Sequence, residues 1–225
     1  MVSENSNNID DLIEKANKGD SDAQFELGDM YWFGDGVEPD DAKALDWYEK
    51  SAEQGNQFAQ YNLGCMYRDG EGVEQDYGKA LEWFEKSAMQ NNAMAQFNIG
   101  CLYCDGEGVE RDYDKALGWF NKSATQNNAK AQNNLGCMYR DGEGIVQNYG
   151  KALDWYEKSA EQGNQFAQFN LGCMYRDGKG VEQSYPKSFV WFEKSALQGD
   201  SDAQFNLGNM YCDGEGVEQD YVKAM

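Results

Sequence analysis

A Leu-Gly or Ile-Gly pair recurs every 36 residues along the chain, with no insertion or deletion between the copies. The six pairs begin at Leu27, Leu63, Ile99, Leu135, Leu171 and Leu207. A tryptophan follows 20 residues after each of the first five pairs, from Trp47 to Trp191. A fixed period of this length is typical of solenoids, in which each repeat buries its apolar face against its neighbours. The period therefore predicts a repeat fold.

Each repeat is predicted to form two antiparallel helices. The first follows an Asp or Asn and the second follows an Asp, Asn or Ser, residues that cap helix N-termini. The linker between them reads Gly-x-Gly-Val or Gly-x-Gly-Ile, and glycine there can adopt the positive φ that ends a helix. We expect an all-α solenoid with a flexible N-terminus (1–8), a capping helix (9–19) and six 36-residue repeats (20–225), the last incomplete.

The apolar stripe of the first helix carries an unusual glycine. Ala23, Leu27 and Tyr31 fall on one helical face, and Gly28 lies beside them in mid-helix. A mid-helix glycine costs about 1 kcal/mol relative to alanine. Since all six copies keep it, we expect the two helices to cross so closely there that no Cβ fits.

The charge of the chain restricts its partners. The formal net charge is −21 and histidine is absent. An acidic surface repels phosphate backbones and anionic lipids, so we expect no nucleic-acid and no membrane partner. A basic protein would instead gain from electrostatic steering. No apolar run reaches the roughly 20 residues of a membrane span, and the polar start lacks a signal peptide, so a cytoplasmic location is expected.

Catalytic and metal chemistry find little support. Without histidine, Ser-His and Cys-His nucleophiles are impossible within this chain. Cys101 and Cys104 lack the second cysteine pair that a structural zinc site needs, and the acidic loops do not follow the order of an EF-hand. Cysteines 36 residues apart should lie about 8–10 Å from one another, beyond the roughly 7 Å that a disulfide spans. We therefore expect free thiols, no enzyme activity, no cofactor and no metal.

One copy of the full pattern runs from Ala59 to Val73 and then from Lys79 to Ala88. It reads Ala-x-x-x-Leu-Gly-x-x-Tyr-x-x-Gly-x-Gly-Val, then Lys-Ala-x-x-Trp-x-x-Lys-Ser-Ala, and it resembles the Sel1-like repeat family. The resemblance implies a right-handed superhelix similar to that of tetratricopeptide repeats, and a role as an adaptor. A cysteine-rich branch of the family carries a disulfide at the positions of Ala52 and Gln60, which this chain does not match.

In tetratricopeptide-like superhelices, the ridge of the first helix opposite the buried stripe lines a concave groove. The candidate partner-binding residues in those columns are Phe58, Tyr61, Arg68, Met94, Phe97, Lys130, Asn133, Arg140, Phe166, Phe169, Arg176 and Phe205. Aromatic residues and arginine favour interface centres. Tyr61 and Phe169 are expected to be anchors that face away from the stacked core. The alternative is that the aromatics pack against neighbouring helices and the arginines pair with nearby acids.

These features favour a monomeric, non-catalytic scaffold that binds a protein or peptide of basic character in the concave groove. An acidic immunity-type protein that covers a basic toxin is the alternative. Recurrence alone does not indicate selection for function, because residues 46–70 and 154–178 differ only at Tyr61 and Phe169. That near-identity is typical of a recent duplication.

Overall fold

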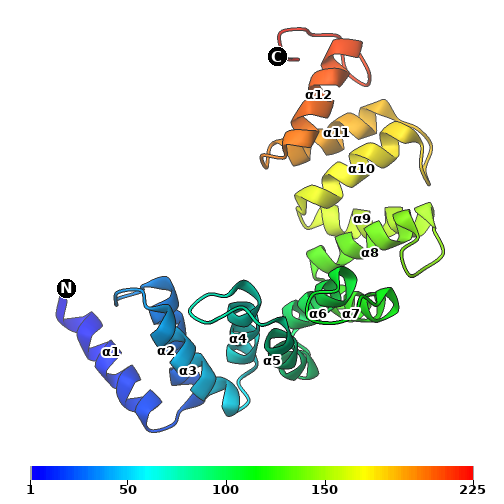
Figure 1. Cartoon of the computed structure of the whole chain (residues 1–225). Coiled ribbons are helices and arrows are strands. Elements are labelled where there is room, and N and C mark those ends of the chain that lie inside the picture. Colours follow the sequence, from blue (N-terminus) through cyan, green and yellow to red (C-terminus); the bar gives the residue numbers. More distant parts are fainter. Residues whose placement is uncertain (1, 225) are drawn as a thin grey trace. The chain divides into compact units, whose positions relative to one another are not determined.

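The computed structural model describes the backbone of residues 2–224 and the side chains of residues 9–224. Over that range it contains twelve helices and no strand (Figure 1). The helices are α1 (Val2–Asn17), α2 (Ser21–Phe33), α3 (Asp41–Glu53), α4 (Gln57–Asp69), α5 (Tyr77–Met89), α6 (Ala93–Asp105), α7 (Tyr113–Thr125), α8 (Ala129–Asp141), α9 (Tyr149–Glu161), α10 (Gln165–Asp177), α11 (Tyr185–Ala196) and α12 (Ser201–Asp213). The predicted all-α solenoid of helix pairs is confirmed.

The chain divides into two compact units, Met1–Asp112 and Tyr113–Met225. In unit 1 consecutive helices pack against each other, from α1 with α2 to α5 with α6. In unit 2 the same holds from α7 to α12. The even-numbered helices α2 to α12 are the first helices of the repeats and are called A helices here. The odd-numbered helices α3 to α11 are the second helices and are called B helices.

The first helix is longer than the sequence predicted. It begins at Val2, where residues 1–8 were expected to be flexible, and it ends at Asn17. No glycine or proline interrupts the stretch, so helix propagation meets no breaker. Met1 and the side chains before Ile9 lie outside the described residues. Leu12 and Ala16 pack against Leu27 of α2, as a capping helix requires.

The ends of the A helices follow the predicted chemistry. Each N-cap side chain accepts a hydrogen bond from a backbone N–H of the first turn, at Asp20, Asn56, Asn92, Asn128, Asn164 and Asp200. Each C-cap is a glycine with φ between +68° and +78°, at Gly34, Gly70, Gly106, Gly142, Gly178 and Gly214. Glycine adopts this conformation without steric cost, which explains the recurrence of the linker.

The mid-helix glycines mark a close crossing between helix A and helix B. The buried rings of Tyr48, Phe84, Tyr156 and Phe192 lie against Gly28, Gly64, Gly136 and Gly172. A Cβ added at any of these four glycines would lie within 2.5 Å of a ring carbon. The close approach that the sequence predicted is therefore filled by an aromatic ring of helix B.

Buried glutamine and serine side chains form hydrogen bonds between successive helices, a feature that the sequence analysis did not predict. Gln60 Nε2 donates to the carbonyl of Ala52 at 3.1 Å, and its Oε1 accepts from Gln90 Nε2 at 2.9 Å. Ser87 Oγ donates to the carbonyl of Gln57 at 2.7 Å. The same bonds recur at glutamines 24, 132 and 168 and at serines 51, 159 and 195. Buried polar groups stabilise a fold when they are satisfied in this way.

Candidate functional site

Five of the predicted site residues are open to solvent. Phe58 is 53% exposed, Phe166 59%, Phe205 70% and Met94 39%, and Lys130 is also exposed. Phe58 and Phe166 occupy the same position, immediately before the first buried alanine of helices α4 and α10. Large apolar side chains with such exposure are the part of this ridge that can bury area against a partner.

Tyr61 and Phe169 lie differently from the prediction. The ring centroid of Tyr61 is 6.0 Å from that of the fully buried Phe84, and Phe169 is 5.6 Å from Phe192. Burial raises the pKa of Tyr61 to about 12. The expectation that these two residues face away from the core is wrong. Each packs against the buried aromatic ring of helix B that contacts the mid-helix glycine. Phe97, in the same column, is also half-buried.

The three arginines of the ridge are engaged within the protein. Arg140 donates from Nε and Nη2 to Asp141 at 2.8 and 2.7 Å, and from Nη1 to Oδ1 of Asn170 at 2.8 Å. Arg68 makes the equivalent three bonds to Asp69 and Asn98, and Arg176 donates from Nε to Asp177 and from Nη1 to Asn206. The pairing with nearby acids is thus confirmed, and these arginines also link neighbouring repeats. Asn133 joins this set by accepting from Asn170 Nδ2 at 3.2 Å.

A groove of about 540 Å³ crosses the A helices of unit 1. We call it the unit-1 groove, and it is lined by Phe25, Asp29, Phe33, Gln57, Phe58, Tyr61, Asn62, Asn91, Asn92, Ala93 and Met94. The residues come from α2, α4 and α6 and the loop before α6. Its walls are dominated by aromatic and apolar side chains, as in many ligand grooves.

A second groove, of about 520 Å³, lies in unit 2. This unit-2 groove is lined by Asn133, Cys137, Arg140, Gln165, Phe166, Phe169, Asn170, Gly199, Asp200, Ser201 and Asp202. The central four positions match those of the unit-1 groove, since Phe166 corresponds to Phe58 and Phe169 to Tyr61. The residues contributed by the neighbouring helices differ between the two grooves, so the same central positions have different chemical surroundings.

Asp29 is the charged member of the unit-1 groove, and the sequence reasoning did not single it out. Its Oδ1 accepts from Tyr48 Oη at 2.7 Å and from Asn62 Nδ2 at 3.3 Å. Burial raises the pKa of its carboxyl, and these two hydrogen bonds oppose that rise. Phe25 and Phe33 were missed as well. Phe25 and Asp29 lie 36 residues before Tyr61 and Cys65, so applying the same ridge positions to repeat one would have identified them. The repeat pattern does not predict a role for Phe33.

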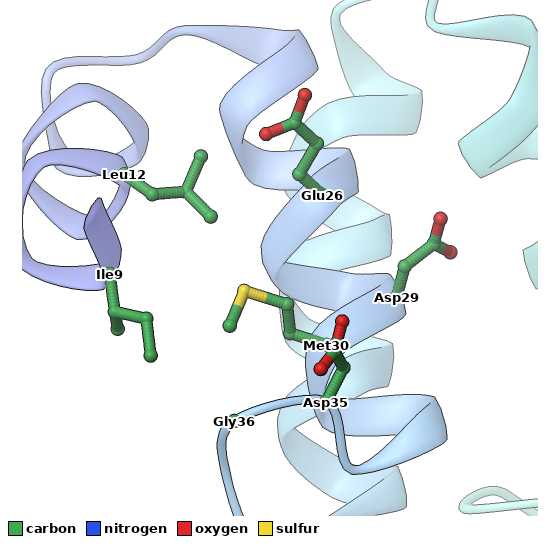
Figure 2. Close-up of a pocket in the computed structure, with 7 residues that line it drawn as sticks. All are labelled: Ile9, Leu12, Glu26, Asp29, Met30, Asp35 and Gly36. Atoms are coloured by element: carbon green, nitrogen blue, oxygen red, sulfur yellow. The ribbon is translucent and has the colours of Figure 1, made fainter. Parts of the chain in front are cut away.

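A further pocket of about 360 Å³ lies between α1 and α2. We call it the α1–α2 pocket, and it is lined by Ile9, Leu12, Glu26, Asp29, Met30, Asp35 and Gly36. Figure 2 shows Leu12 of α1 and Met30 of α2 pointing toward each other, while the Asp29 carboxylate points to the other side of α2. Asp29 therefore lies at a boundary that this pocket shares with the unit-1 groove.

The five tryptophans of the B helices are covered by lysines. A lysine Nζ lies 3.6–4.3 Å from the ring centroid of each of Trp47, Trp83, Trp119, Trp155 and Trp191. Such cation–π contacts use both the ring face and the positive charge. Each of these tryptophan rings therefore already has a cationic partner within the protein.

The thiols of the ridge are shielded. Burial raises the pKa of Cys65, Cys137 and Cys173, which keeps them protonated at neutral pH. No disulfide joins any two of the six cysteines, all of which lie in the described part of the chain. Among residues 9–224 there is no cluster of three or more Cys, Asp or Glu side chains arranged to hold a metal ion.

Between Val2 and Ala224, no helix combines the length and the apolar character needed to cross a membrane.

Comparison with known proteins identifies the repeat. The Sel1 repeat model matches residues 21–56, 57–92, 93–128, 129–164, 165–200 and 201–225. No curated protein sequence matches the chain at a significant level. Among solved structures, a protective antigen of uropathogenic Escherichia coli strains with an SLR fold is 41% identical, with a TM-score of 0.91. The match covers 96% of this chain and 46% of that protein, so this chain spans about half its length.

Two further structures complete the comparison. A Sel1 repeat protein from Oxalobacter formigenes is 30% identical over 96% of this chain and 95% of its own, with a TM-score of 0.86. An immunity protein from Pseudomonas aeruginosa is 25% identical over 87% of this chain and 74% of its own, with a TM-score of 0.55. The six registered matches cover nearly all of the sequence. On these grounds the chain belongs to the Sel1 repeat family.

Proposed function

We propose that this chain is a non-catalytic scaffold that holds a protein or peptide partner along its A helices. The observation that carries the proposal is the exposure of Phe58 and Phe166, each in a groove of more than 500 Å³. An exposed ring set in a concave, partly apolar surface gains binding energy when a partner covers it. Sel1 repeat proteins generally mediate protein–protein interactions, which supports this reading.

The partner in this proposal is a protein segment of basic character. The net charge of −21 favours such a partner through steering and through complementary contacts. The same charge disfavours nucleic acid. A cytoplasmic location fits a chain whose six cysteines are free thiols, because thiols stay reduced in that compartment.

The test uses affinity purification from the native host with four baits, followed by calorimetry with each captured partner. The baits are the wild type, Phe58→Ala, Phe166→Ala and the control Met89→Ala. Met89 is 77% exposed on α5 and lines neither groove, so it tests exposure alone. A groove mutant should weaken binding by about 10- to 100-fold, the effect of an anchor residue, while the control should change it less than about twofold. Equal binding by all four proteins would refute the proposal.

An acidic immunity-type protein is the second candidate function. Solved immunity proteins from Pseudomonas aeruginosa share the repeat fold, one of them at 25% identity, and the strong negative charge of this chain suits a basic toxin. The stoichiometry and affinity of the captured partner distinguish the two candidates. One tight partner encoded beside this gene, bound one to one, would favour the immunity role. Several looser partners would favour the scaffold.

A further inference from the structure

We infer that the unit-1 groove and the α1–α2 pocket together bind a segment in which a lysine or arginine lies about three residues from a bulky apolar side chain. This inference rests on the proposed function and specifies the partner for one of its two grooves.

The apolar half of the inference follows from the walls of the unit-1 groove. Phe33 is 73% exposed, Phe58 53% and Met94 39%. The ring of Phe25 lies 5.9 Å from that of Phe58, so the two rings form a continuous apolar surface. The side chains come from three successive A helices and surround a volume of about 540 Å³. A partner's aromatic or long aliphatic side chain would bury this exposed area.

The basic half follows from Asp29 and the pocket beyond it. The hydrogen bonds from Tyr48 and Asn62 both end on Oδ1 of Asp29, and no donor among the described residues is bonded to Oδ2. The α1–α2 pocket adds the exposed carboxylates of Glu26 and Asp35. The linings of the groove and the pocket together carry three carboxylates, from Glu26, Asp29 and Asp35, and no lysine or arginine.

The α1–α2 pocket also suits the stem of a basic side chain. Ile9, Leu12 and Met30 supply the apolar part of the lining, and Figure 2 shows the side chains of Leu12 and Met30 facing the space between the helices. Lysine and arginine bury their aliphatic stems on such surfaces and leave the charge at a polar edge. A wall of this kind beside carboxylates therefore selects a long basic side chain over a small cation.

The spacing of the motif follows from the helix packing. Stacked helices lie about 8–10 Å apart, and the two sites flank one A helix, α2. An extended peptide advances about 3.3–3.6 Å per residue, so about three residues separate the two side chains.

The unit-2 groove supplies an internal contrast. Asn133 stands where unit 1 has Phe25, Cys137 where it has Asp29, and Asp202 where it has Met94. Arg140 adds a positive charge to the same wall. The exposed phenylalanine is retained, but Phe25 and Met94 have polar counterparts, and the two aspartates of this groove, Asp200 and Asp202, share its lining with Arg140. The inference therefore predicts that the two grooves select different sequences.

The first experiment selects peptides directly and needs no identified partner. A random dodecapeptide library displayed on phage is panned against the full chain, and the bound clones are retested on Phe58→Ala and Phe166→Ala. These variants change the same residue type at equivalent positions of nearly identical repeats. Clones lost only on Phe58→Ala should share a bulky apolar residue about three positions from a lysine or arginine. Clones lost only on Phe166→Ala should lack that pairing.

The second experiment measures one Phe58-dependent peptide by fluorescence anisotropy. Asp29→Asn keeps an Oδ1 acceptor for Tyr48 and Asn62 but removes the charge, and it should weaken binding about 5- to 20-fold. Glu26→Gln, at an exposed position, should act in the same direction. With norleucine in place of the basic residue, binding should be weaker and no longer respond to Asp29→Asn. Thermal melts confirm that each variant is folded.

The outcomes separate this inference from the proposed function. Phe58-dependent peptides without a basic residue, or an Asp29→Asn effect that persists with norleucine, would overturn the inference and leave the scaffold proposal standing. Peptides that depend on Phe166 alone would do the same. If neither phenylalanine affects any selected peptide, the groove-binding proposal fails and the inference fails with it.

Discussion

Gly136 tests the packing of the solenoid most directly. A Cβ added to Gly136 would lie 2.5 Å from Cδ1 and Cε1 of Tyr156 and 3.0 Å from its Cγ. Carbon atoms in contact prefer about 3.5–4.0 Å, so the ring or the helix must move by about 1 Å. Tyr156 is completely buried and its hydroxyl lies 3.3 Å from Cys137 Sγ, which leaves the ring little room to retreat.

The expected magnitudes follow from that geometry. Overpacking a core costs about 1–3 kcal/mol, and replacing a mid-helix glycine by alanine returns up to about 1 kcal/mol of helix propensity. Gly136→Ala should therefore lose about 0–2 kcal/mol of unfolding free energy. Valine carries two methyl groups more than alanine and has a lower helix propensity, so Gly136→Val should lose about 3 kcal/mol or more of unfolding free energy.

Urea unfolding followed by circular dichroism measures both variants, with Gly118→Ala as the matched control. Gly118 lies within α7 and a Cβ there would meet nothing within 4 Å, so alanine should stabilise by about 0.5–1 kcal/mol. In a Tyr156→Ala background the cost of Gly136→Val should largely disappear, because the clashing ring is gone. A loss below about 0.5 kcal/mol for Gly136→Val, or an undiminished loss in that background, would refute the proposed packing.

Three further outcomes are expected. Thiol titration under denaturing, non-reducing conditions should count six groups per chain, one for each cysteine, and fewer thiols with a gel shift on reduction would show a disulfide. Native Cys137 should alkylate slowly at pH 8 because burial raises its pKa. Millimolar calcium should leave the melting temperature where magnesium leaves it, and a saturable, calcium-specific rise would reveal a site in the acidic loops. The hydrogen bond from Arg176 lowers the pKa of Asp177, so its stabilisation is present above its ordinary value of 3.8 and is lost as the pH falls through the lowered one. Asp177→Asn should thus lower the urea midpoint at pH 7, with the gap to wild type closing under acid; a pH-independent gap would show that the charge is not the cause.

The local features of the fold were predictable because they depend on short segments of chain. The period of 36 residues, the Asp and Asn caps and the positive-φ glycines each need only neighbouring backbone groups. The close helix crossing at Gly28 was also predictable, since an unfavourable residue kept in every repeat needs a steric reason. That an aromatic ring of helix B fills the crossing followed only from the tertiary structure.

The ridge of the A helices was predicted only in part. Helical periodicity placed Phe58 and Tyr61 on one face, yet Phe58 is half exposed and Tyr61 packs on Phe84. The difference depends on the packing of Phe84 in helix B against Gly64 in helix A. These residues are 20 positions apart in the sequence, so a helical wheel of one helix cannot predict their contact. Likewise Asp29 became part of a site only when α1, α2 and α4 packed around it. The sequence by itself determined the repeat, its caps and its charge. The tertiary structure decided which side chains of the ridge remain open, because neighbouring repeats bury each one to a different extent.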